Sequence, residues 1–281
     1  MLDISGKIDQ QTVAIFGLIA SVSEARNLKF FVVGATARDL VLQHGFGIEA
    51  RRATRDIDLA VQVSNWDEFE ALKMGLIKTG SFAKTRMTQR LQYQETMPVD
   101  IVPFGAIKEA DGTISWPPKH VIRMNILGFE DAYQDAMQIR LSLEPSLEIL
   151  VASPSSLAAL KLLAWNDRAP ANTRDAIDLN FITRNYLDAG NNERLHDEHA
   201  DLLDDDFDYV VTGARLLGRD IANILGVESI TVLKKILKEQ TREADRYPLV
   251  EDMTRAGAGD QFEENLELLK AFKQGVTDIT G

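Results

Sequence analysis

Residues 54–61, Thr-Arg-Asp-Ile-Asp-Leu-Ala-Val, constrain the chain most, because two aspartates separated by one residue stand in an apolar, β-branched run. Side chains alternate between the two faces of a β-strand, so Asp56 and Asp58 project from one face and Ile57 and Leu59 from the other. The apolar face favours packing on a core. Alone, the pattern is more typical of a half-buried strand with polar outside residues than of a strand that holds a divalent metal, and two neighbouring segments favour the metal.

The segment upstream predicts a strand, a glycine and a helix in that order. Residues 29–33, Lys-Phe-Phe-Val-Val, form a buried strand, and a helical stretch begins after Gly34. The first N–H groups of a helix have no intrahelical partner and attract phosphate. We therefore expect backbone donors at Gly34 and Ala35 to hold a phosphate group, with Thr36 and Arg38 beside them.

The segment downstream places one carboxylate inside an apolar strand. Asp100 interrupts residues 98–104, Pro-Val-Asp-Ile-Val-Pro-Phe. A buried aspartate is costly unless something pairs it. A metal ion shared with Asp56 and Asp58 would be that partner.

Together these motifs resemble the nucleotidyltransferase superfamily that includes DNA polymerase beta and kanamycin nucleotidyltransferase. Residues 52–58, Arg-Ala-Thr-Arg-Asp-Ile-Asp, resemble in particular the AbiEii/AbiGii toxin family of nucleotidyltransferases. So do residues 157–164, Leu-Ala-Ala-Leu-Lys-Leu-Leu-Ala, followed by Arg168 and by residues 174–179, Arg-Asp-Ala-Ile-Asp-Leu. The match spans residues 28–182 and departs from the superfamily at Gly34-Ala35, where Gly-Gly or Gly-Ser is usual.

The resemblance implies an enzyme that moves a nucleoside monophosphate from a nucleoside triphosphate to an RNA, protein or small-molecule acceptor. Asp56, Asp58 and Asp100 would hold Mg²⁺, or Mn²⁺ as the alternative, and carry out catalysis. Lys161 would contact the nucleotide phosphates, and Asp178 would orient Lys161 or bind near the nucleotide. The family also implies a toxin of a toxin–antitoxin or phage-defence pair, with a cognate antitoxin as partner.

Several alternatives stay open. The spacing Gly-x-x-x-Arg38-Asp39 also resembles tRNA nucleotidyltransferases that add the CCA end, which would make tRNA the acceptor. A catalytically retired nucleotide-binding module is the non-enzymatic alternative. Lys161 can instead extend from a helix face to solvent. Asp175 can act with Asp178 or complement Arg174 at a helix start.

The expected fold class is α+β, with a mixed β-sheet flanked by helices as the nucleotidyltransferase core and an all-α carboxyl-terminal domain. We expect residues 1–150 to form the catalytic domain and residues 151–281 a helical domain that contributes to the nucleotide site. The periodicity predicts helices over 8–26, 35–42, 65–78, 154–166, 173–188, 207–225, 229–244 and 260–274. It predicts strands over 29–33, 56–63, 86–93, 99–104, 121–129 and 139–143.

The composition limits which kinds of binding site and which cellular compartment we expect for this chain. The 281-residue chain has no cysteine, so a disulfide or a thiolate metal site is excluded. No apolar run approaches a membrane span and the first residues lack a signal-peptide layout, so we expect a cytoplasmic protein without a membrane partner.

The net charge of −12 argues against a broad, sequence-independent grip on nucleic acid. A local basic patch beside the aspartates stays an open alternative, and a solvated strand edge accounts equally well for Lys84, Arg86 and Arg90. The members of the patch in the sequence are Arg51, Arg52, Arg55, Lys84, Arg86 and Arg90.

Overall fold

The computed structural model describes residues 1–50, 56–203, 207–255 and 261–281. The chain forms two compact units, Met1–Ser153 and Pro154–Gly281. The first unit contains all the strands of the described residues, and the second is helical. The mixed sheet and the helical carboxyl-terminal region confirm the predicted α+β class.

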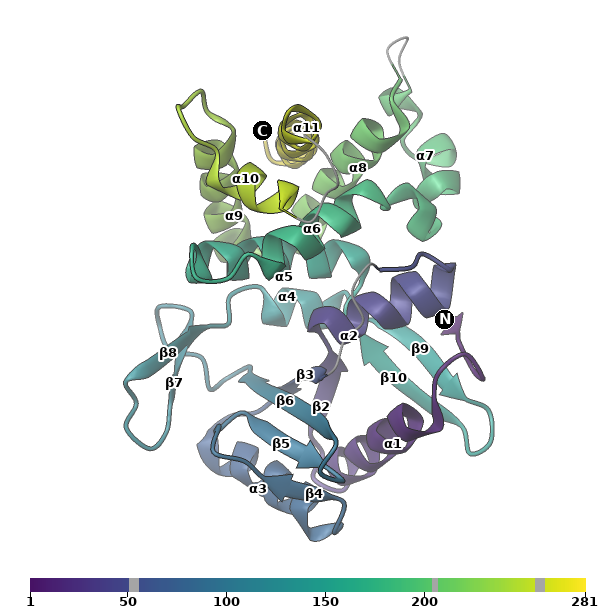
Figure 1. Cartoon of the computed structure of the whole chain (residues 1–281), viewed down its shortest axis with the longest axis vertical. Coiled ribbons are helices and arrows are strands. Elements are labelled where there is room, and N and C mark those ends of the chain that lie inside the picture. Colours follow the sequence, from purple (N-terminus) through teal and green to yellow (C-terminus); the bar gives the residue numbers. More distant parts are fainter. Residues whose placement is uncertain (51–55, 204–206, 256–260) are drawn as a thin grey trace. The chain divides into compact units, whose positions relative to one another are not determined.

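An eight-stranded sheet organises the first unit, in the order β1-β9-β10-β2-β3-β6-β5-β4 (Figure 1). Its strands are β1 (Leu2–Asp3), β2 (Lys29–Val32), β3 (Ile57–Gln62), β4 (Phe82–Lys84), β5 (Arg90–Tyr93), β6 (Met97–Phe104), β9 (Met137–Ser142) and β10 (Leu147–Val151). The sheet is mixed, because β3 and β6 run parallel while β2/β3 and β5/β6 are antiparallel. A separate hairpin joins β7 (Thr113–Trp116) to β8 (Ile122–Asn125).

Helices α1 (Gln10–Glu24) and α3 (Trp66–Lys78) pack side by side on one face of the sheet (Figure 1). Each begins at a side-chain cap. Asp9 accepts a hydrogen bond from the Thr12 N–H at 2.8 Å, and Asn65 accepts one from the Glu68 N–H at 3.0 Å. These caps satisfy N–H groups that the helix itself leaves without partners.

The core fixes the register of the central strands. Ile57, Leu59 and Val61 on one face of β3 are buried, at exposed fractions of 3%, 0% and 0%. A slip of one residue would move this apolar face to the other side and carry Asp58 into the core. The burial of three neighbouring apolar side chains therefore determines which way the aspartates point.

The second unit consists of helices that mostly match the predicted ones. They are α5 (Pro154–Arg168), α6 (Arg174–Arg184), α7 (Asn192–Asp197), α8 (Tyr209–Ile224), α9 (Val227–Thr241), α10 (Pro248–Thr254) and α11 (Phe262–Thr280). Helices α8 and α11 cross closely, since a Cβ atom at Gly218 or Gly275 would overlap the backbone of the other helix. Among the described residues, no helix is both long enough and apolar enough to span a membrane.

Several predicted elements need correction. The predicted strand over 121–129 ends at Asn125, and α4 (Phe129–Gln134) follows after Gly128, whose φ is +83°. The strands β7 and β10 and the helix α10 lie where the sequence predicted no helix or strand. The predicted strand over 86–93 begins only at Arg90. These elements are too short for their periodicity to stand out from the surrounding turns.

The close crossing of α8 and α11 predicts that Gly275→Ala destabilises the protein. The added methyl group would overlap the Arg215 carbonyl, so the helices must separate, at a cost of about 1–3 kcal/mol. Urea unfolding followed by circular dichroism measures the change in midpoint. Gly17→Ala in α1 is the matched control, because its methyl group would lie 4.0 Å from the nearest atom, on Leu147, and alanine favours a helix. Equal losses in both variants would contradict the close crossing.

Candidate functional site

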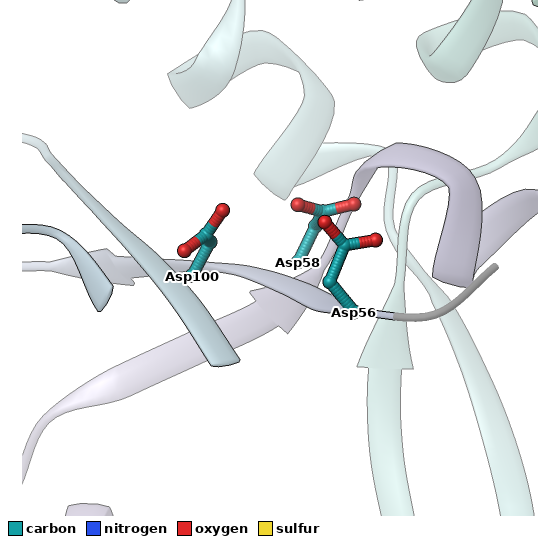
Figure 2. Close-up of side chains that lie close together, drawn as sticks. All are labelled: Asp56, Asp58 and Asp100. Atoms are coloured by element: carbon teal, nitrogen blue, oxygen red, sulfur yellow. The ribbon is translucent and has the colours of Figure 1, made fainter. Parts of the chain in front are cut away.

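Three of the predicted site residues meet on two neighbouring strands of the sheet. Asp58 lies in β3 directly opposite Asp100 in the parallel strand β6, and Asp56 comes just before β3. Each residue offers one carboxylate oxygen, and these three oxygens lie within 4.8 Å of one another. Figure 2 shows the three carboxylates side by side and pointing the same way. The arrangement brings together the residues that the sequence predicted to share a metal.

Backbone hydrogen bonds hold this arrangement rigidly. Residues 57–62 of β3 pair in register with residues 99–104 of β6, and β2 pairs with the other edge of β3. The Val33 N–H donates to the Asp58 carbonyl at 3.0 Å, directly before the turn at Gly34. Carboxylates on paired strands keep their positions better than carboxylates on loops.

Arg90 supplies the positive charge that this acidic group needs. It lies opposite Asp100 in the antiparallel pair β5/β6. Its Nε donates to Asp100 Oδ1 and its Nη2 to Asp100 Oδ2, both at 2.6 Å, and Nη2 lies 3.6 Å from Asp56 Oδ2. The hydrogen bond to Asp100 raises the pKa of Arg90, helped by the charges of Asp100, Asp56 and Asp58 and opposed by partial burial. Asp100 thus has a protein partner, and its side chain is half-buried, at 19% exposed.

Arg90, a member of the basic patch in the sequence, pairs with Asp100, and the sequence pattern did not predict this contact. The hairpin that joins β5 to β6 sets that pairing, since Tyr93 lies opposite Met97 and Arg90 therefore opposite Asp100. A correct prediction of the turn at residues 94–96 would have placed Arg90 opposite Asp100.

The rest of the basic patch is only partly described. Lys84 ends β4, and Arg86 is exposed in the following loop, not on a strand. Arg51, Arg52 and Arg55 lie outside the described residues.

The turn at Gly34 packs directly against the acidic strand. Gly34 has a φ of +65°, and a Cβ atom there would overlap the Asp58 carboxylate. The Thr36 hydroxyl donates to the Asp56 carbonyl at 3.0 Å and accepts from the Asp58 N–H at 3.2 Å. Thr36 therefore ties the start of α2 (Gly34–Arg38) to the Asp-x-Asp segment.

Two other residues of α2 were predicted to lie near a phosphate. Ala35 follows Gly34 in the first turn of the helix and is half-buried. Arg38 is buried, and its Nη2 lies 2.6 Å from Asp39 Oδ1. The helix continues beyond Arg38 as wider π-helical turns over Asp39–Gly45.

Lys161 and Asp178 meet in the second unit, where α5 packs on α6. Lys161 Nζ lies 2.5 Å from Asp178 Oδ2 and 3.3 Å from Asp175 Oδ1, and Arg168 Nη2 lies 2.9 Å from Asp175 Oδ2. Lys161 does not extend freely to solvent, because its side chain is only 12% exposed. Asp175, whose place the sequence left open between Asp178 and Arg174, belongs to the same cluster.

Solved structures of nucleotidyltransferases resemble the chain at low sequence identity. The antibiotic-resistance factor ANT(2'')-Ia is 14% identical with a TM-score of 0.37, over 69% of this chain and 96% of that one. The lincosamide antibiotic adenylyltransferase LnuA, lincomycin-bound, is 16% identical with a TM-score of 0.37, over 62% and 96%. The Thermotoga maritima CCA-adding enzyme complexed with tRNA is 14% identical with a TM-score of 0.26, over 98% and 84%. No curated protein matches the sequence.

The family described as "Nucleotidyl transferase AbiEii toxin, Type IV TA system" matches residues 19–275. The match includes the Gly34 turn, the three aspartates and the Lys161 cluster. It extends over both units and nearly all of the 281 residues, and the chain therefore belongs to the AbiEii family of nucleotidyltransferases.

Proposed function

We propose that this nucleotidyltransferase moves a nucleoside monophosphate from a nucleoside triphosphate to an RNA, protein or small-molecule acceptor, with Asp56, Asp58 and Asp100 as its metal-binding carboxylates. The meeting of the three carboxylate oxygens within 4.8 Å carries the proposal. The family description supports a role as the toxin of a toxin–antitoxin pair, with a cognate antitoxin as partner. We further propose that the protein acts in the cytoplasm.

The three carboxylates fit a hard divalent cation. Oxygen ligands suit Mg²⁺ and Mn²⁺, and the absence of a side chain at Gly34 leaves space for the Asp58 carboxylate. When bound, such ions neutralise phosphate oxygens and make the acceptor hydroxyl more acidic. In this proposal Asp56 and Asp58 would bind both metal ions, and Asp100 would bind the ion nearest the acceptor.

The proposed reaction forms one bond and breaks one. An oxygen of the acceptor attacks the α-phosphorus, the bond to the β-phosphate oxygen breaks, and pyrophosphate leaves. Asp100 accepts the proton of the acceptor hydroxyl, directly or after Arg90 has moved. Because phosphoryl transfer is catalysed mainly by positioning and by stabilising charge, the rigid strands around the aspartates matter as much as their chemistry.

We propose that hydrogen-bond donors and cations of both units bind the nucleotide phosphates. Backbone N–H groups at Gly34 and Ala35 would hold the triphosphate, with Arg38 in the same helix, while Thr36 keeps that turn against the acidic strand. On the family resemblance, Lys161 would add a point charge to the phosphates and Asp178 would orient it. In this proposal residues 1–150 are the catalytic domain and residues 151–281 contribute to nucleotide binding.

The first test is transfer of label from each α-³²P nucleoside triphosphate to total RNA or total protein. We expect Mg²⁺-dependent labelling by the wild-type protein and none by Asp58→Asn, because the variant loses a charged metal ligand. Calorimetry should show nucleotide binding with Mg²⁺ weakened at least about tenfold in Asp58→Asn.

Asp111→Asn is the control for that test, since Asp111 is an exposed carboxylate paired with Arg123 on the same unit. It should label and bind as the wild type does. Ordered incorporation of CTP and ATP into trimmed tRNA would instead identify a CCA-adding enzyme. Nucleotide binding without labelling under any condition would identify a binding module.

A second prediction concerns the space at Gly34. Gly34→Ala should lower Mn²⁺ affinity about tenfold or more, because the new methyl group must displace the Asp58 carboxylate. Gly47→Ala is the matched control. Gly47 has a φ of +74° against +65° at Gly34, so both variants carry a backbone cost of about 1–2 kcal/mol, but nothing lies within 4 Å of a Cβ at Gly47. Equal affinities in the two variants would show that the contact with Asp58 does not matter.

A third prediction separates folding from nucleotide binding at Lys161. Lys161→Met removes the cation from two largely buried carboxylates and should lower the free energy of unfolding by about 3 kcal/mol. The double variant Lys161→Met/Asp178→Leu should recover most of that loss. If Lys161 contacts phosphate, label transfer stays lost in the double variant although stability returns. Wild-type transfer by the stable double variant would remove both residues from the nucleotide site.

A further inference from the structure

Arg90 engages the oxygens that the proposed function assigns to a metal. Asp58, Asp100 and Arg90 lie opposite one another on the adjacent strands β3, β6 and β5. Two parallel hydrogen bonds of 2.6 Å connect the Arg90 guanidinium to both oxygens of Asp100. The same Nη2 atom reaches to 3.6 Å from Asp56 Oδ2. The guanidinium therefore touches two of the three carboxylates.

This pairing opposes metal binding for two physical reasons. A carboxylate that accepts a bidentate guanidinium uses lone pairs that a metal ion also needs. A positive charge at the edge of the acidic group also repels an incoming cation. Without a metal, on the other hand, the guanidinium offsets the repulsion among the three carboxylates.

We propose that Arg90 is a positioning residue that competes with a divalent metal ion for Asp100. The inference rests on the proposed function, because it assumes that the three aspartates form the metal site. A metal ion can bind Asp100 only after the Arg90 guanidinium has left that carboxylate. Arg90 thereby lowers the affinity of the acidic group for an ion that uses Asp100.

The surroundings of Arg90 allow the side chain to move without the strand. Its side chain is 27% exposed, whereas its carbonyl accepts a hydrogen bond from the Thr85 hydroxyl at 3.0 Å. The backbone is thus held while the guanidinium can turn toward solvent. Because arginine keeps its charge at any physiological pH, a released Arg90 is a ready partner for a phosphate group of the nucleotide or of the acceptor.

The test measures Mn²⁺ binding to the full chain. Electron paramagnetic resonance detects free Mn²⁺, so the loss of that signal reports how much Mn²⁺ is bound. Arg90→Gln should bind Mn²⁺ at the Asp100 side about tenfold or more tightly than the wild type, because the competing charge-assisted hydrogen bonds are gone. Arg90→Lys keeps the positive charge but loses the two parallel hydrogen bonds. Its affinity for Mn²⁺ should therefore lie between those of the wild type and Arg90→Gln.

Arg140→Gln is the matched control. Arg140 lies opposite Glu148 in the antiparallel pair β9/β10, donates to it at 2.8 Å and 3.0 Å, and is 27% exposed like Arg90. Arg140→Gln removes a comparable cross-strand ion pair and leaves Asp56, Asp58 and Asp100 unchanged. Mn²⁺ binding by Arg140→Gln should equal that of the wild type.

The outcomes are distinct. Wild-type affinity in both Arg90 variants, with binding that still depends on Asp58, overturns the competition and leaves the proposed function intact. Absence of Mn²⁺ binding in the wild type and in every variant overturns both. If circular dichroism shows that Arg90→Gln is unfolded, Arg90→Lys alone decides, and an affinity equal to that of the wild type overturns the inference.

Discussion

The mutual repulsion of Asp56, Asp58 and Asp100 is the constraint on which the structure of the first unit depends. Three carboxylates whose oxygens lie within 4.8 Å of one another need a cation among them or beside them to offset their repulsion. The fold meets this requirement with its own residue, because Arg90 binds both oxygens of Asp100. Arg90 therefore offsets part of the negative charge of the acidic group before any ligand arrives.

Holding like charges together requires a backbone that cannot relax away from them. Asp58 and Asp100 are fixed opposite each other by the parallel pairing of β3 and β6, and the buried apolar face of β3 prevents a register slip. The Thr36 hydroxyl adds two hydrogen bonds to the backbone of the same segment. Gly34 is needed because any side chain there would meet the Asp58 carboxylate. Each of these features keeps the aspartates in place against their repulsion.

Local periodicity was enough to predict the aspartate strand and most helices of the second unit, whereas the family resemblance implied that Asp178 orients Lys161. Asp100 was found because a carboxylate inside an apolar strand requires a partner, but the sequence suggested a metal where the structure has Arg90. That pairing depends on a turn in which Gln94 and Glu95 take φ values of 43° and 58°, although neither residue is typical of such a conformation. Cross-strand register set by an unusual turn cannot be deduced from alternation alone.

The second unit also holds two neighbouring carboxylates beside cations. There the Lys161 ammonium lies between Asp175 and Asp178, and Arg168 pairs with Asp175 from the other side. Both clusters thus present cations that are already engaged by carboxylates. A polyanion that binds at either cluster must displace a carboxylate from its cation, so part of the energy of each new contact is spent on breaking an old one. In a chain of net charge −12, a polyanion also meets a general repulsion, which a divalent cation bound to the polyanion reduces.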